Sequence, residues 1–234
     1  LMCGIIGVII KKPSQEDFDT IKHVFLESKI RGMHATGLSY VKEYQIHTEK
    51  LPVAADQFPF DFPKYLNEDG NLYMVGHCRY STSDLEFNQP FNNDTLSIVH
   101  NGVITQELPE KWKDLYGYDC VTKNDSELLL HTIEDDKCPI TTWVESSLAV
   151  CELWFCKRLR FYRNGKRPIY FTSLSNGYII TSTEDVAKRA GLDMTVEVPM
   201  NTYMNIDQDL AVTIQKVYTN NADLQGLEYE TVRI

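Results

Sequence analysis

Residues 3–10 read Cys-Gly-Ile-Ile-Gly-Val-Ile-Ile, and the chain's architecture can be worked out from this stretch. Residues 5–10 form an apolar run rich in β-branched side chains, which predicts a buried strand. Pro13 and Ser14 end the strand, and residues 14–17 resemble a capping box. Apolar side chains then recur at helical spacing, so we expect a helix over residues 15–28.

Further along, strands outnumber helices, and the helices do not follow each strand in turn. Such an order favours two packed sheets with helices outside, an α+β arrangement, over a doubly wound parallel fold. Asn164-Gly165 and Asn176-Gly177 predict hairpin turns, residues 53–71 predict a surface loop or insertion, and residues 1–234 are expected to form one domain. The expected helices are 125–133, capped by Asn124 or Asp125, and 184–190; the expected strands are 37–41, 72–76, 96–99, 148–155, 159–163, 169–172, 178–182, 202–206 and 211–217.

Composition narrows the class of protein. The chain has 43% hydrophobic and 24% charged residues, which is typical of a globular protein. A net charge of −10 argues against nucleic acid as a partner. The sequence has neither an apolar membrane span nor a signal peptide. We therefore expect a cytoplasmic location and no association with a membrane. The six cysteines have irregular spacing and no C-x-x-C pair, so neither a zinc site nor a disulfide framework is expected. No other metal and no cofactor is expected.

Cys3 has particular chemistry if Met2 is an initiator that is removed. The residue would then carry a thiol and a free α-amine, whose pKa of about 7.7–8.0 lets it act as a base at neutral pH. The alternative is a small buried hydrophobe at the start of a strand. The catalytic interpretation requires that Leu1-Met2 be absent from the active protein, because an amide nitrogen is not a base.

Four further segments combine turn glycines with charged or amide side chains, and each by itself is typical of a turn. They are residues 31–37 (RGMHATG), 76–82 (GHCRYST), 100–102 (HNG) and 124–127 (NDSE). Together with the opening Cys-Gly-Ile, residues 88–91 (NQPF) and residues 162–170 (YRNGKRPIY), their order resembles class II glutamine amidotransferase domains of the N-terminal nucleophile hydrolase superfamily. His34 departs from this pattern, since the family commonly has an acidic residue there.

The resemblance implies a four-layer αββα sandwich and a glutamine site. It implies that Cys3 is the nucleophile and that the Asn101 side-chain amide and the Gly102 backbone N–H form an oxyanion hole. Arg79 would bind the α-carboxylate of glutamine and Asp125 its α-ammonium, although Asp125 is also a good helix cap. The remaining residues that the resemblance assigns to the substrate site are Arg31, His77 and Thr82, with His77 expected to support Arg79.

The expected reaction is hydrolysis of L-glutamine to glutamate and ammonia through a Cys3 thioester. No phosphate-binding or dinucleotide-binding motif is visible, so a separate synthetase subunit is expected to use the ammonia, or the chain is a fragment; a homo-oligomer is left open. Two alternatives remain. One is an N-terminal nucleophile hydrolase of another amide, which would have no use for Arg79 paired with Asp125. The other is a catalytically silent glutamine-binding module, which a blocked Cys3 would permit.

Overall fold

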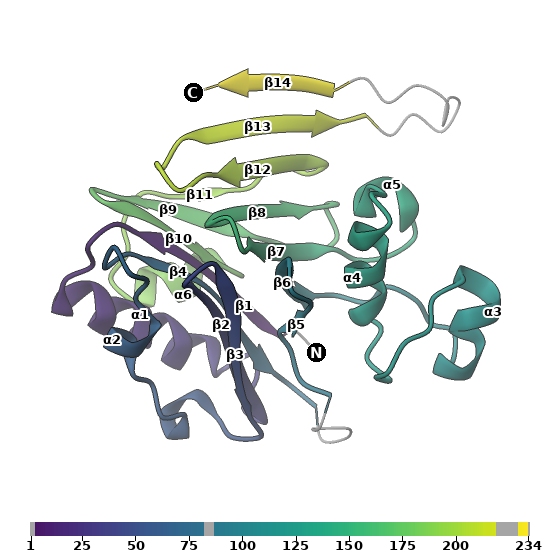
Figure 1. The fold of residues 1–234 in the computed structure, drawn as a ribbon, viewed down its shortest axis with the longest axis horizontal. Helices are drawn as coiled ribbons and strands as arrows, with labels where there is room; N and C mark the ends of the chain where they lie inside the picture. The colour runs from purple at the N-terminus through teal and green to yellow at the C-terminus, as the bar shows by residue number, and fades with distance from the viewer. Residues whose placement is uncertain (1–2, 82–86, 219–228, 234) are drawn as a thin grey trace.

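The computed structural model describes residues 3–81, 87–218 and 229–233 and contains two stacked antiparallel sheets (Figure 1). The first sheet has the order β11-β9-β10-β1-β4-β2-β3 and the second β14-β13-β12-β8-β7-β6-β5. First-sheet strands are β1 (Gly4–Ile10), β2 (Ala35–Lys42), β3 (Gln45–Leu51), β4 (Leu72–Arg79), β9 (Tyr170–Leu174), β10 (Gly177–Thr181) and β11 (Thr195–Glu197). Second-sheet strands are β5 (Phe91–Asn92), β6 (Leu96–Asn101), β7 (Ala149–Trp154), β8 (Arg158–Arg163), β12 (Thr202–Ile206), β13 (Val212–Val217) and β14 (Tyr229–Arg233).

Strand β1 is apolar throughout because both of its faces are covered. Ile6 and Val8 pack against the outer helices, whereas Ile5 and Ile9 enter the core between the sheets. This alternation follows from the two-residue period of a strand. At Gly7, a Cβ would come within 2.7 Å of the Cys151 sulfur on the second sheet, so glycine lets the two sheets approach closely. The strand predicted over residues 5–10 is confirmed.

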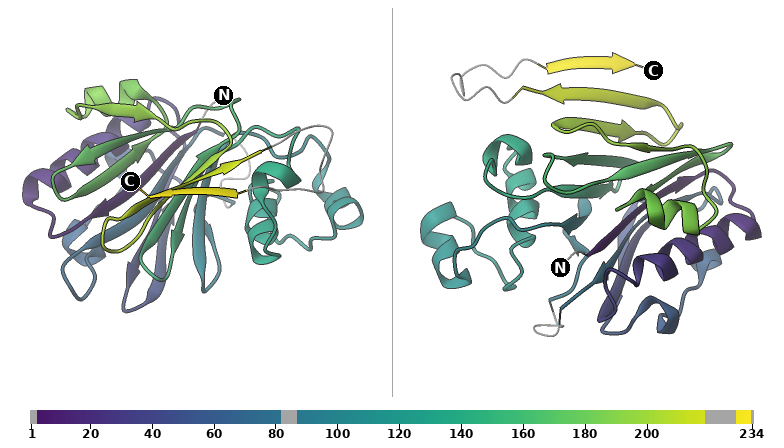
Figure 2. Two further views of the ribbon diagram at one scale, coloured as in Figure 1. Left: turned by 90° about the horizontal axis from the view of Figure 1, so that it is seen from above. Right: turned by 180° about the vertical axis from the view of Figure 1, so that it is seen from behind.

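Helices cover both outer faces and complete the predicted αββα sandwich (Figure 2). The first sheet is covered by α1 (Gln15–Ser28), α2 (Phe62–Tyr65) and α6 (Glu184–Arg189), and the second by α3 (Trp112–Tyr116), α4 (Glu127–Glu134) and α5 (Pro139–Thr142). Helix α1 starts with the predicted capping box between Ser14 and Asp17. No helix in the described part of the chain is long and apolar enough to cross a membrane.

Two local predictions differ from the structure, and strand β3 was not predicted. Asn176-Gly177 does join the β9–β10 hairpin, but the Asn164-Gly165 turn leads from β8 in the second sheet to β9 in the first. Residues 53–71 are not a simple surface loop, because they include α2 and bury the aromatic rings of Phe58, Phe62 and Tyr65 in the core under α1. Strand β3 was missed because it is an edge strand whose side chains are largely polar and partly exposed.

Candidate functional site

Three strand ends of the first sheet meet where the candidate residues lie. Gly4 at the start of β1 pairs with Cys78 near the end of β4, and Ala35 at the start of β2 pairs with Arg79. Cys3 therefore precedes β1 at the edge where Arg79 ends β4. The second sheet contributes Asn101, the last residue of β6. Antiparallel pairing brings the ends of β1, β2 and β4 together, and the stacking of the two sheets adds Asn101, which is 98 positions from Cys3 in the chain.

Asn101 is directly connected to Cys3. The Cys3 backbone nitrogen donates a hydrogen bond of 3.1 Å to Asn101 Oδ1. That bond fixes the orientation of the amide, whose Nδ2 is buried and has no hydrogen-bond partner among the described residues. Gly102 follows with φ of +143°, a region that favours glycine, and a Cβ there would overlap the Ser147 carbonyl oxygen. The two residues therefore form a constrained corner with an unused N–H donor.

The Cys3 thiol lies in an environment with opposing electrostatic effects. Burial raises the pKa of the thiol above its usual value, whereas a hydrogen bond with the Tyr80 backbone and the charges of Arg79 and Arg167 lower it. Because burial dominates, the thiol is protonated at neutral pH and needs a base to become a nucleophile. Arg167 was not singled out as a site residue from the sequence; it follows a turn, and nothing in its local spacing indicates proximity to Cys3.

His100 is a support for the Asn101–Gly102 corner. Its Nε2 lies 2.9 Å from the Ser147 carbonyl oxygen and its Nδ1 lies 2.8 Å from Ser126 Oγ. A carbonyl only accepts, so Nε2 carries the proton. The Gln89 side chain holds the His100 backbone on both sides, accepting from its N–H at 2.6 Å and donating to its carbonyl at 3.2 Å. Burial lowers the pKa of His100, so it is neutral and structural.

Arg79 and Asp125 are each held in position by neighbouring groups. Arg79 Nη1 donates to Asn88 Oδ1 at 2.8 Å and to the Phe87 carbonyl at 3.4 Å. Asp125 Oδ2 accepts from the backbone N–H groups of Ile104 at 2.6 Å and Thr105 at 3.2 Å. Asp125 is therefore not the cap of α4, which begins at Glu127 with no side-chain cap. Instead it ties the start of α4 to the segment after Gly102. Asn88 was missed as a positioning residue.

Comparison with known proteins finds similar sequences. The chain is 30% identical over 142 residues to the glutamine–fructose-6-phosphate aminotransferase of Clostridium tetani, covering 57% of this chain and 22% of the relative. It is 24% identical over 187 residues to the Sulfurisphaera tokodaii enzyme of the same name, covering 76% and 31%. Over the matched residues the chain is therefore homologous to class II glutamine amidotransferases. It spans less than a third of the length of these relatives.

Solved structures show the same fold as this chain. The glutamine phosphoribosylpyrophosphate amidotransferase of B. subtilis has a TM-score of 0.68 at 18% identity, covering 97% of this chain and 49% of that one. A structure described as the allosteric regulatory enzyme of purine biosynthesis has a TM-score of 0.67, also at 18% identity, covering 97% of this chain and 48% of that one. No protein-family model matches the chain. At this identity the structural likeness establishes the N-terminal nucleophile hydrolase fold.

The loop after α1 lies against the end of β4 beside Arg79. A Cβ on Gly32 would overlap the Cys78 carbonyl oxygen, so glycine allows the loop to lie directly on β4. His34, which replaces the family's usual acidic residue, donates its backbone N–H to the Arg79 carbonyl at 3.0 Å. Its ring Nδ1 accepts from the Ser81 backbone N–H at 3.2 Å. The histidine thus fastens the loop to the end of β4.

The other predicted site residues differ in how deeply their side chains are buried. Arg31 is half-buried; burial, with a smaller contribution from the Arg167 charge, lowers its pKa. His77 is buried between the sheets, where burial and then the Arg79 charge lower its pKa to about 3 in spite of a hydrogen bond with the His100 backbone. A neutral, buried His77 favours a supporting role. Thr82 lies outside the described residues.

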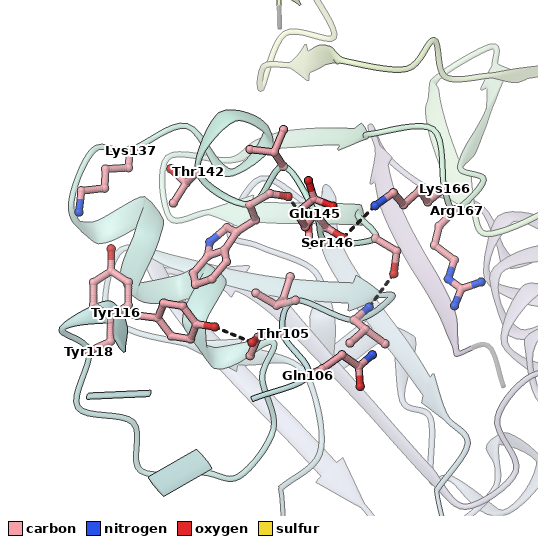
Figure 3. Close-up of a pocket in the computed structure, with 15 residues that line it drawn as sticks. Thr105, Gln106, Tyr116, Tyr118, Lys137, Thr142, Glu145, Ser146, Lys166 and Arg167 are labelled. Atoms are coloured by element: carbon pink, nitrogen blue, oxygen red, sulfur yellow. Dashed lines mark hydrogen bonds between the residues drawn. The ribbon is translucent and has the colours of Figure 1, made fainter. Parts of the chain in front are cut away.

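A cavity of about 640 Å³ adjoins the segment after Gly102 (Figure 3). Val103, Ile104 and Thr105 form one wall, and Arg167, whose charge acts on the Cys3 thiol, lies at its edge. In its lining, Thr105 Oγ1 and the Tyr116 hydroxyl are hydrogen-bonded at 2.6 Å. The cavity therefore borders the backbone groups that hold Asp125, on the helical side of the domain.

Proposed function

We propose that this domain hydrolyses the side-chain amide of L-glutamine, with Cys3 as nucleophile and the Cys3 α-amine as base. The single observation that supports this most strongly is the Asn101 amide. Its oxygen accepts from the Cys3 nitrogen at 3.1 Å, and its buried nitrogen donates to no described group. A buried N–H without a partner costs about 1–3 kcal/mol, so its retention next to a cysteine favours a role in binding a transient oxyanion.

Substrate recognition would divide between two charged groups. The guanidinium of Arg79 matches the α-carboxylate of glutamine, since its fork geometry suits a carboxylate. The carboxylate of Asp125 matches the α-ammonium; both of its backbone hydrogen bonds are made by Oδ2. Asn88 holds Arg79 through Nη1. Arg31 and Thr82 would complete the pocket, and His77 would support Arg79 from the core.

The chemistry then follows in two steps. The α-amine takes the thiol proton, and the thiolate sulfur bonds to the amide carbon of glutamine, creating an oxyanion that the Asn101 side chain and the Gly102 backbone N–H stabilise. As the carbon–nitrogen bond breaks, the α-ammonium returns the proton to the departing ammonia. Water then attacks the thioester, which releases glutamate and restores the thiol.

Ammonia would be consumed by a synthetase activity that lies outside residues 1–234, on a separate subunit or on a further part of the same protein. The relatives support this, because the chain spans only 22% and 31% of two enzymes named as aminotransferases. Residues 1–234 would act as one glutaminase unit. The acceptor that receives the ammonia would be identified by an amination assay with that partner present. The oligomeric state of the chain would be measured in the same complex.

The deciding experiment measures glutamate release by protein that begins at Cys3, with Cys3→Ala as the paired variant. We expect hydrolysis of glutamine by the first and none by the second. The electrophilic glutamine analogue diazo-oxo-norleucine should label Cys3 and leave the buried Cys78 unlabelled. Labelling elsewhere would refute the assignment. Activity on other amides but not on glutamine would indicate a different hydrolase, and binding of glutamine without turnover a silent module.

A further inference from the structure

A second chemical cluster lies on α4 and on the segment before it, and it uses none of the residues assigned to glutamine. Cys120, Glu127 and His131 bring a thiol, a carboxylate and an imidazole together, with one candidate ligand atom from each lying within 4.8 Å of the others. Glu127 and His131 are four residues apart and so share one face of the helix. Cys120 comes from the segment before α4. From this cluster we propose a zinc site.

The orientation of His131 is the observation that carries this proposal furthest. Its Nδ1 lies 2.9 Å from Glu134 Oε2, and a carboxylate only accepts, so this bond favours the tautomer with the proton on Nδ1. The Nε2 lone pair is then directed toward the cluster, where Nε2 is buried and has no hydrogen-bond partner among the residues that the structure describes. A carboxylate that orients the far nitrogen of a histidine ligand is the usual second shell of a metal site.

The other members of the cluster are also held in place. Glu127 is 6% exposed; its Oε1 accepts from the Val121 N–H at 2.9 Å and its Oε2 from the Thr122 N–H at 2.8 Å. Oε2 also accepts from Thr122 Oγ1 at 2.6 Å, whereas Oε1, the oxygen nearer His131 Nε2, has a further lone pair available for a metal ion. Glu134, which orients His131, is itself held by a 2.7 Å hydrogen bond from Asn93 Nδ2. The cluster therefore has preset donors and needs little ordering to bind an ion.

The donor set selects the metal. Thiolate, imidazole and carboxylate together suit Zn²⁺, with water in the fourth position of a tetrahedron. Zinc–ligand bonds of about 2.0–2.3 Å put ligand atoms roughly 3.3–3.8 Å apart. His131 Nε2 and Glu127 Oε1 already lie 3.5 Å apart, so Cys120 needs the main adjustment. Binding releases the thiol proton, since thiolate is the ligand.

A zinc ion bound here would link α4, through Glu127 and His131, to Cys120 on the segment that leads to Asp125. We call this link the clasp. Without metal, that segment is held by Glu127 through Val121 and Thr122. Zinc would add Cys120 to the same anchor. The clasp does not depend on glutamine chemistry, so it can be tested by metal binding alone.

The test uses the chain with Cys3→Ala as background, because an N-terminal cysteine can itself chelate metals through its thiol and amine. Zinc is titrated against a chromogenic chelator, and Co²⁺ reports on sulfur ligation through its thiolate charge-transfer absorption. We expect one ion per chain, with this absorption lost in Cys120→Ser and kept in Cys156→Ser, a control at an exposed cysteine. Glu134→Gln should weaken binding about 10–100-fold and keep the absorption.

Alkylation covers the case in which Cys120→Ser does not fold. Zinc should slow iodoacetamide labelling of Cys120, measured by peptide mass spectrometry, and leave the rate at Cys156 unchanged. Absence of protection, absence of zinc binding, or a cobalt spectrum that survives Cys120→Ser would overturn the proposal. The cluster would then be an ion pair between His131 and Glu127 with a neighbouring thiol.

Discussion

Replacing Asn101 tests the proposed oxyanion hole, because its two side-chain atoms have separable roles. Oδ1 holds the Cys3 nitrogen at 3.1 Å, while Nδ2 is buried and free of partners among the described residues. Asn101→Ala removes both atoms. Asn101→Asp keeps an acceptor for the Cys3 nitrogen but loses the N–H donor and adds a negative charge beside the developing oxyanion.

The magnitude follows from these contacts. Loss of one oxyanion donor costs about 2.7–4 kcal/mol, or roughly 10²–10³ in kcat. Loss of the bond to Cys3 adds the cost of one ordinary hydrogen bond, about 1 kcal/mol. Asn101 is 2% exposed, so bulk water cannot easily replace the missing donor. We therefore expect kcat to fall at least 10²-fold in both variants, with KM for glutamine changing much less.

The assay is steady-state glutamate release over a range of glutamine concentrations, with circular dichroism to confirm the fold. Asn92→Ala, at an exposed amide on the neighbouring strand β5, should retain the wild-type kcat. Near-normal activity of Asn101→Asp would refute the oxyanion role, because that variant keeps only the anchoring of Cys3. A loss confined to KM would likewise mean that Asn101 binds the ground state of the substrate.

Three further predictions follow from other contacts. Arg79→Lys loses the guanidinium fork and Asp125→Asn loses the charge, and each should lower kcat/KM for glutamine by an amount equivalent to about 2–5 kcal/mol of transition-state stabilisation. For glutamine analogues that lack the α-carboxylate or the α-ammonium, the matching substitution should change kcat/KM far less. Unchanged kinetics with glutamine would contradict the recognition model. Protein that keeps residues ahead of Cys3 should be inactive until they are removed, since an amide nitrogen is no base; equal rates, with intact masses verified, would exclude the α-amine. Gly32→Ala should destabilise the domain by about 1–3 kcal/mol in urea unfolding because its Cβ overlaps the Cys78 carbonyl oxygen, whereas Asn92→Ala, at an exposed side chain, should change the free energy of unfolding by less than about 0.5 kcal/mol; equal losses would mean that the loop shifts freely.

The sequence by itself predicted the layers of this fold. A run of apolar β-branched residues at 5–10, a capping box before α1 and the excess of strands over helices are local signals, and local propensity and periodicity determine each of them. The motifs around Cys3, Arg79, Asn101 and Asp125 were also visible, because the family resemblance depends on short ordered stretches. Residues 53–71 were misjudged because their burial depends on packing against α1. Strand β3 was missed because it is defined by pairing with β2 at the edge of the sheet.

The tertiary structure alone decided how these residues meet. Cys3 and Asn101 are 98 positions apart, and only the stacking of β1 against the second sheet brings the Cys3 nitrogen to Asn101 Oδ1. Asp125 looked like a helix cap, yet its carboxylate holds the segment after Gly102. Irregular cysteine spacing predicted no metal site, whereas the turn before α4 carries Cys120 to Glu127 and His131. Periodicity reports which face of an element is buried, and contacts between distant elements depend on the register and packing of the whole chain.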